Sequence, residues 1–121
     1  MTDLRFPRRL RLLTSGDFSR VFERADVKVP DQHLLILARR NDLGHPRIGF
    51  VIAKKNIRRA VKRNRVRRIM RESFRLHQHE LPALDMIILA RKGLDTLESS
   101  ELHAVIRRCW SRVGKKARKL T

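Results

Sequence analysis

Between residues 54 and 75 the chain carries eleven Lys or Arg residues and a single acid, Glu72. Apolar and small side chains nevertheless recur through this region at the spacing of an α-helix, so they project onto one stripe. The stripe consists of Val66, Ile69, Met70, Ser73 and His77. Residues 58–79 are therefore predicted to form a helix that packs one side against a sheet, which excludes a fold made of extended structure alone.

The opposite side of the predicted helix is basic. Its stripe consists of Asn64, Arg67, Arg68, Arg71 and Arg75, and Lys62, Arg63 and Arg65 are assigned to the same surface. Like charges one turn apart destabilise an exposed helix by about 0.2–0.5 kcal/mol per pair. Solvated helices normally interleave Glu with Lys, whereas Arg, whose planar fork suits phosphate, dominates here. A polyanion-binding surface is therefore favoured over a merely solvated one.

The remaining composition is typical of one small folded domain. In 121 residues, 41% are hydrophobic, and 30 Lys and Arg oppose 12 Asp and Glu, for a net charge of +18. Nucleic acid is the favoured partner, although charge alone also permits an anionic membrane surface or an acidic protein. No apolar run is long enough for a membrane helix, and the N-terminus lacks the apolar stretch of a secretory signal. With one cysteine, Cys109, the expected location is the reducing cytoplasm.

Hydrophobic periodicity and turn residues predict the other elements. A short helix is expected from Thr14 to near Arg24 and a final amphipathic helix at 98–116. Strands are expected at 27–29, 33–40, 47–55 and 85–91, with the second and third forming a hairpin through the turn at 41–46. The predicted fold is a single α+β domain, order α-β-β-β-α-β-α, with a mixed four-stranded sheet. The predicted division is a basic arm at 1–13, an RNA-binding α/β domain at 14–114 and a basic tail at 115–121.

Residues for catalysis by the protein itself are not evident. The histidines show no metal-ligand spacing, the carboxylates form no close pair, and no phosphate loop or nucleophile motif is present. No catalytic residue and no metal site are therefore predicted in the protein. Because the helices are separated by strands, a DNA-compacting or helix-turn-helix regulator is less favoured than RNA recognition through phosphates. A structural, ribosomal-type RNA-binding protein remains the alternative.

An ordered set of motifs resembles the ribonuclease P protein family. The set comprises Asp17-Phe18, Val21-Phe22, and residues 47–55, 60–68 with Arg63-Asn64-Arg65, 71–74 and 85–92. The resemblance spans residues 5–113. It implies a left-handed βαβ crossover through the Arg-rich helix, an exception to the usual hand. It also implies a catalytic ribonuclease P RNA as partner, which cleaves the 5′ leader from precursor tRNA with Mg²⁺ bound by the RNA, and no required protein or membrane partner.

The resemblance also implies two groups of binding residues. The RNA-facing helix would use Arg63, Asn64, Arg65, Arg67, Arg68 and Arg71. A leader-binding cleft between the first helix and the sheet would use Phe18, Phe22, Ile36, Lys54 and Lys55. Aromatic rings there could stack on leader bases. Ile36 stands where some relatives carry tyrosine, so only an apolar contact is expected from it.

Overall fold

The computed structural model describes residues 7–120 of the chain. Its strands are β1 (Val27–Pro30), β2 (Leu34–Arg40), β3 (Arg47–Val51) and β4 (Leu84–Ala90). Its helices are α1 (Ser15–Glu23), α2 (Ala60–His77) and α3 (Ser99–Arg118), with short 3₁₀ turns η1 (Arg8–Leu10), η2 (Gln78–Glu80) and η3 (Leu94–Thr96). This order confirms the predicted α+β class and the α-β-β-β-α-β-α sequence of elements.

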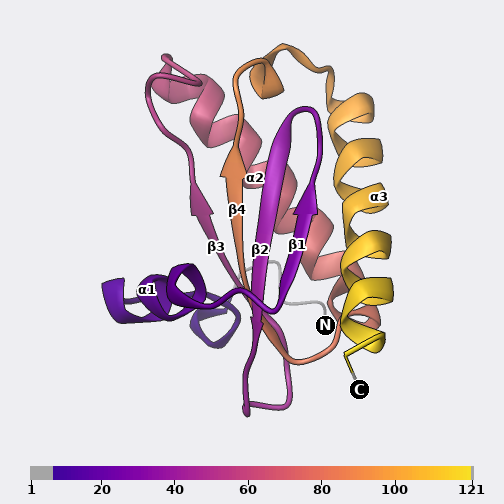
Figure 1. Ribbon diagram of the computed structural model, residues 1–121. Helices are drawn as coiled ribbons and strands as arrows, with labels where there is room; N and C mark the ends of the chain where they lie inside the picture. The colour runs from indigo at the N-terminus through magenta and orange to yellow at the C-terminus, as the bar shows by residue number, and fades with distance from the viewer. Residues whose placement is uncertain (1–6, 121) are drawn as a thin grey trace.

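The four strands form one mixed sheet in the order β1-β2-β4-β3. β1 and β2 are antiparallel, β2 and β4 are antiparallel, and β3 and β4 are parallel. In Figure 1, α2 lies behind the sheet while the chain moves from β3 on the left to β4 beside it, both strands pointing up. That path is a left-handed crossover, as the family resemblance implies and against the usual hand.

The predicted hairpin between the second and third strands is wrong. β4 lies between β2 and β3 and pairs with both, so the loop at 41–46 spans one intervening strand. Asn41 at the start of that loop is also held beside β4, because its backbone N–H donates to the carbonyl of Ala83, the residue before that strand, at 3.1 Å. The hairpin in this sheet is instead β1 with β2, where Val27 is opposite Ala38.

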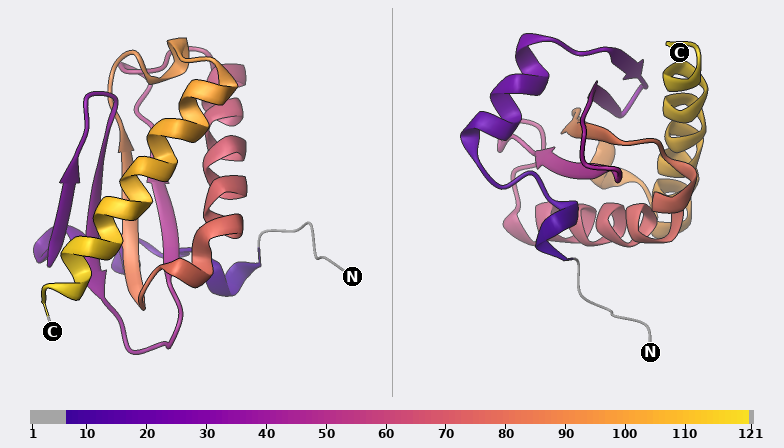
Figure 2. Two further views of the ribbon diagram at one scale, coloured as in Figure 1. Left: turned by 90° about the vertical axis from the view of Figure 1, so that its right-hand side faces the viewer. Right: turned by 90° about the horizontal axis from the view of Figure 1, so that it is seen from below.

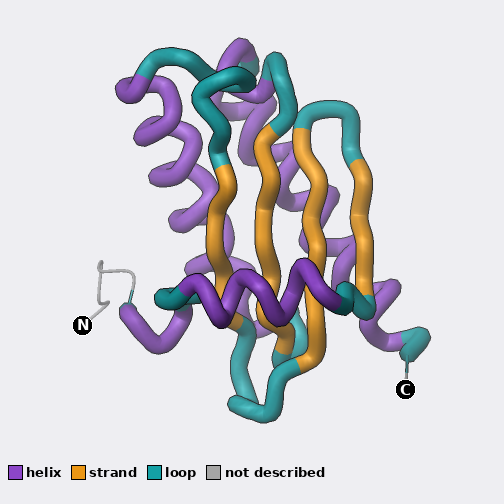
Figure 3. Tube along the Cα trace, turned by 60° about the vertical axis from the view of Figure 1, so that its left-hand side comes forward, coloured by secondary structure: helices purple, strands orange, loops and turns teal. Residues whose placement is uncertain are grey.

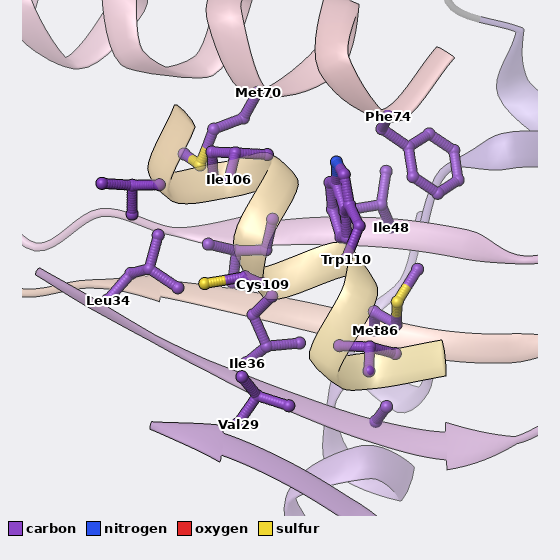
Figure 4. Packing of buried hydrophobic residues seen from close by; sticks show 14 of the residues in the cluster. Val29, Leu34, Ile36, Ile48, Met70, Phe74, Met86, Ile106, Cys109 and Trp110 are labelled. Carbon is purple, nitrogen blue, oxygen red and sulfur yellow. The ribbon is translucent and has the colours of Figure 1, made fainter. Parts of the chain in front are cut away.

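Helices cover the two faces of the sheet unequally. α2 and α3 lie side by side on one face (Figure 2), and the main core fills the space between them and the strands (Figure 4). Trp110 of α3 is 2% exposed there, as expected of a core residue. Its indole Nε1 donates to Ser73 Oγ at 2.9 Å, and its ring meets Phe74 edge-on at 5.9 Å. On the other face α1 crosses the strands near one end (Figure 3).

The predicted arm and tail are partly built into the folded domain. Leu10 and Leu12 are 2% and 6% exposed, and Arg11 forms a parallel bridge with Ile48 of β3. At the other end α3 continues to Arg118, and Ala117 is buried. Leu10 and Ala117 of these segments belong to the main core, and the division at 13/14 and 114/115 stays a prediction. Residues 1–6 of the predicted arm and residue 121 lie outside the described part.

Candidate nucleic-acid interface

The two faces of α2 are arranged largely as the periodicity predicts. Val66, Ile69, Met70 and Ser73 are buried, and Phe74 joins them at 0% exposure. The outward side carries Asn64, Arg68 and Arg71, which are exposed, with Arg67 and Arg75 half-buried. His77, which was predicted to lie on the buried stripe, is half-buried, and its Nδ1 bonds to the Ser73 carbonyl at 2.8 Å. A single helix therefore anchors the core and presents a continuous cationic surface, called here the α2 basic face (Asn64, Arg67, Arg68, Arg71, Arg75).

Two of the flanking cations make contacts within the protein. Arg63 Nη1 donates to the carbonyls of Ile57 and Arg58, at 3.0 and 2.7 Å, in the segment that leads into α2. Lys62 Nζ lies 3.8 Å from Asp95 Oδ2. α2 begins without a side-chain cap and without an acid in its first turn. Arg63 thus stabilises the backbone before a helix whose own start is poorly stabilised.

Arg65 is likewise held by the protein. Its Nη2 donates to the Leu97 carbonyl at 2.9 Å and to Ser99 Oγ at 3.2 Å, which fixes the start of α3 against α2. A guanidinium has five donors, so this geometry leaves Arg65 able to contact a phosphate as well. RNA contact by Lys62, Arg63 and Arg65 therefore remains a prediction, and the structure adds a structural role for each of these side chains.

The two phenylalanines of α1 have different environments. Phe18 is half-buried and packs with Val21 in a small apolar cluster beneath the helix. Its ring lies so close to β3 that a Cβ on Gly49 would be 2.5 Å from Phe18 Cζ. Phe22 is 49% exposed. Phe18 therefore helps anchor α1 on the sheet, whereas the ring of Phe22 is open to solvent.

The assignment of Ile36 to the α1 side of the sheet is wrong. Ile36 is 0% exposed and belongs to the core beneath α3, near Cys109 in Figure 4. Side chains alternate between the faces of a strand, so the α1 side receives its neighbour Leu35. Register aligns Leu35 with Leu89 of β4, and Leu89 with Val51 of β3, and all three are half-exposed. This row, the open row (Leu35, Leu89, Val51), is the apolar surface that α1 leaves uncovered.

The predicted lysine pair lies past the end of β3. Residues 54–56 form a turn, and both Lys54 and Lys55 are exposed. Asn56, which no sequence motif marks as functional, donates from Nδ2 to the Ala90 carbonyl at 2.9 Å. That bond fixes the turn to the end of β4, so two cations stand at the far end of the strands that carry the open row.

A buried ionic contact holds the start of β3 to β4 near α1. Arg47 donates from Nε and Nη2 to the two carboxylate oxygens of Asp85, at 2.8 and 2.7 Å, and Asp85 is 4% exposed. Asn41 Nδ2 donates to the same carboxylate at 2.8 Å. The bond to Asp85 raises the pKa of Arg47 despite partial burial. A fully bonded pair of this kind fixes the local geometry more than it adds stability.

The same arginine reaches α1 through Asp17. Arg47 Nη2 lies 3.6 Å from Asp17 Oδ1, and Asp17 forms a capping box with Thr14 at the start of the helix. Burial acts to raise the pKa of Asp17, but hydrogen bonds from the Leu13 and Thr14 backbones and the charge of Arg47 lower it overall. The predicted helix start at Thr14 is thus confirmed, and it is tied electrostatically to the sheet.

Two features of other protein classes are absent from residues 7–120. No helix in that range is long and apolar enough to span a bilayer. Within the same range, no three His, Cys, Asp or Glu side chains group together as ligands for a metal ion.

Comparisons with known proteins agree on one family. The family model described as Ribonuclease P matches residues 6–114. The ribonuclease P protein component of Chromohalobacter salexigens is 56% identical over 119 residues, covering 98% of this chain and 93% of the relative. That of Proteus mirabilis is 49% identical over 119 residues, covering 98% and 99%.

Solved structures agree in fold. A Staphylococcus aureus RNase P protein mutant with defective mRNA degradation activity aligns with a TM-score of 0.80 at 24% identity, covering 86% of this chain and 87% of that one. The RNase P protein from Thermotoga maritima aligns with a TM-score of 0.75 at 24% identity, covering 85% and 96%. At such identity these two structures support the architecture alone.

Proposed function

Since this chain belongs to the ribonuclease P protein family, and so serves tRNA 5′-end maturation as the protein component of an RNA-based endonuclease, we propose how its surfaces divide that work. The α2 basic face holds the ribonuclease P RNA through phosphates. The open row, with Phe22 and the lysine turn, holds the 5′ leader of precursor tRNA. The RNA performs the hydrolysis with its own Mg²⁺, in the cytoplasm, and no further protein is required.

The observation that carries this proposal is the outward arrangement of α2. Arg68 and Arg71 are exposed on the same side of the helix, and Glu72 is the sole acid among residues 60–77. Each phosphate neutralised by such a side chain releases counterions, so binding gains free energy and becomes salt-dependent. A surface of this kind positions RNA by its backbone, as recognition of a folded RNA requires.

The open row supports the leader assignment. Its side chains are apolar and half-exposed, Phe22 exposes its ring from α1 on the same face of the sheet, and Lys54 and Lys55 follow the end of β3. A single strand offers bases that stack on rings and phosphates that attract cations. An extended leader lying along the strands would meet both kinds of group in succession, whatever its sequence.

Reconstitution tests the proposal. The purified protein is mixed with a bacterial ribonuclease P RNA and a precursor tRNA carrying a 5′ leader, at low Mg²⁺ concentration. Cleavage at the mature 5′ end that needs both components supports the proposal, whereas cleavage unaffected by the protein contradicts it.

Two variants separate the two surfaces. Arg68→Ala is expected to weaken binding of the catalytic RNA and to reduce the slope of log K against log salt by about one. Phe22→Ala is expected to weaken binding of leader-bearing substrate more than mature tRNA, by up to about 1–3 kcal/mol for one stacked base. Because Phe22 is 49% exposed, this variant changes the fold less than Phe18→Ala would. Equal effects of Phe22→Ala on both RNAs would remove the open row from the leader site.

A further inference from the structure

A pocket of about 180 Å³ opens at the outer edge of β3, where the N-terminal segment, the strand and α2 meet. Its lining includes Arg11, Phe18, Gly49, Phe50, Arg67 and Arg71. These residues come from both faces of the sheet, since Phe18 and Gly49 lie on the α1 side while Phe50 packs toward the main core. The pocket therefore lies between the open row and the α2 basic face, and neither predicted binding surface includes Arg11.

Its charge is one-sided. Three arginines from two separate segments, Arg11, Arg67 and Arg71, line it, and none of its described lining residues is acidic. Burial, and then the positive charges of Arg11 and Arg67, lower the pKa of Arg71. Guanidinium groups gathered in this way repel one another, and an anion bound between them would relieve that repulsion.

The rest of the lining is apolar and aromatic. Arg71 lies over the Phe50 ring, with its Cζ 5.8 Å from the ring centroid, and Phe18 forms a second aromatic wall. The volume is below the roughly 300–1,000 Å³ typical of sites for drug-sized molecules. The dimensions and the mixed lining suit a phosphate with its adjoining base rather than a long stretch of polynucleotide.

The backbone of the edge strand also faces this pocket. Leu12 N–H donates to the Ile48 carbonyl at 3.0 Å, so Ile48 turns its backbone groups outward. Residues two apart in a strand direct their backbone groups to the same side, so Phe50 presents its own N–H and C=O along that edge. Arg11 is brought to the pocket by the bridge that its own segment makes with Ile48.

We propose that this pocket binds one phosphodiester of an RNA strand, held by Arg11, Arg67 and Arg71. The neighbouring base is turned out of the RNA stack and packs against Phe50. The strand crosses the β3 edge there on its way between the open row and the α2 basic face. The identity of the strand, which is the catalytic RNA or the leader, rests on the proposed function. Arg11 becomes a binding residue that no motif in the sequence indicated.

The first experiment follows the arginine side chains without any large RNA. The Nε–H signals of Arg11, Arg67 and Arg71 are followed by NMR while uridine 3′-monophosphate, inorganic phosphate or uridine is added to the full-length protein. The nucleotide is expected to shift all three signals and to bind at least about fivefold more tightly than phosphate, because stacking adds to the ionic contact. Equal binding of nucleotide and phosphate would overturn the assignment of a base, and no shift with either would overturn the pocket.

The second experiment measures binding of ribonuclease P RNA and of precursor tRNA with and without its leader. Arg11→Gln is expected to weaken binding of at least one RNA about fivefold to tenfold and to lower its salt slope by about one. Arg107→Gln, which removes an exposed charge from α3, is the matched control and is expected to change affinity less than about twofold. Equal effects of the two variants would overturn the proposal, whereas failure of the unmodified protein to bind these RNAs would count against the proposed function instead.

A conservative variant guards against loss of fold. Arg11→Lys keeps the charge but loses the planar fork, so it is expected to keep the salt slope while binding about twofold to fivefold less tightly. Affinity equal to that of the unmodified protein would show that no bidentate contact is made at Arg11 and would overturn its assigned role.

Discussion

Replacing Gly49 by alanine tests whether the Phe18 ring is fixed against β3. The added Cβ would lie 2.5 Å from Phe18 Cζ, 2.7 Å from Phe18 Cε1 and 3.1 Å from Leu12 Cδ1. Ordinary carbon contacts are about 3.5–4.0 Å, so the ring or the strand must move by about 1 Å. Overpacking of this kind costs about 1–3 kcal/mol, and a stiffer unfolded chain returns about 0.4–1 kcal/mol. The expected net loss in the free energy of unfolding is about 1–2 kcal/mol.

Urea denaturation of Gly49→Ala, Phe18→Ala and the double variant measures this effect. If the clash is with the ring, Gly49→Ala should cost little on the Phe18→Ala background, giving a coupling of about 1–2 kcal/mol. Gly16→Ala is the control, because its Cβ would meet only Thr14 Oγ1, at an ordinary 3.6 Å. Additive effects of the two substitutions, or a Gly49→Ala protein as stable as the unmodified one, would refute the close packing of Phe18 on β3.

Three further outcomes are expected. The folded-state pKa of Asp17 is lowered from 3.8, so the stability that Asp17 contributes is complete above that pH and is lost as pH falls through the lower folded value. Stability of Asp17→Asn, measured against pH, should therefore fall less than that of the unmodified protein in this acid range. Burial raises the pKa of Cys109 to about 11, so a thiol reagent at pH 8 should label it only on unfolding, and rapid labelling would contradict its burial. Arg63→Ala should lower the urea midpoint because it removes two bonds to loop carbonyls, whereas Arg68→Ala should leave that midpoint unchanged.

Local patterns predicted the helices well, and long-range pairing limited the prediction of the sheet. The helix start at Thr14 depends on side chains within four residues, so the sequence alone revealed it. The hairpin failed because β4 comes more than thirty residues after β3 and still inserts beside it. Turn residues at 41–46 indicate a reversal of direction, which did occur, but not which strand fills the space between.

The same distinction explains the site. The stripe through α2 was predictable because a helix with an apolar side and a basic side has one possible orientation against a core. The strand at 34–40 has apolar residues at both alternating sets, so nothing local decided whether Leu35 or Ile36 would face α1. Nor could periodicity show that Arg63 and Arg65 reach carbonyls of neighbouring segments, since those carbonyls approach only in the folded chain.

The hydrogen bonds show where on the molecule the cations behind the net charge of +18 are placed, which composition alone does not show. On the β1 side, Arg112 donates to the Pro30 carbonyl and Lys116 to the Lys28 carbonyl, so cations of α3 close that edge of the sheet. On the β3 side, Arg11 and Arg67 line a pocket and Arg68 is exposed on α2. Two cations of α3 thus bond to carbonyls at one edge of the sheet, and cations placed to meet an anion lie at the other. RNA is therefore expected to approach from the β3 and α2 side, and removing charge at Arg112 should affect stability more than RNA affinity.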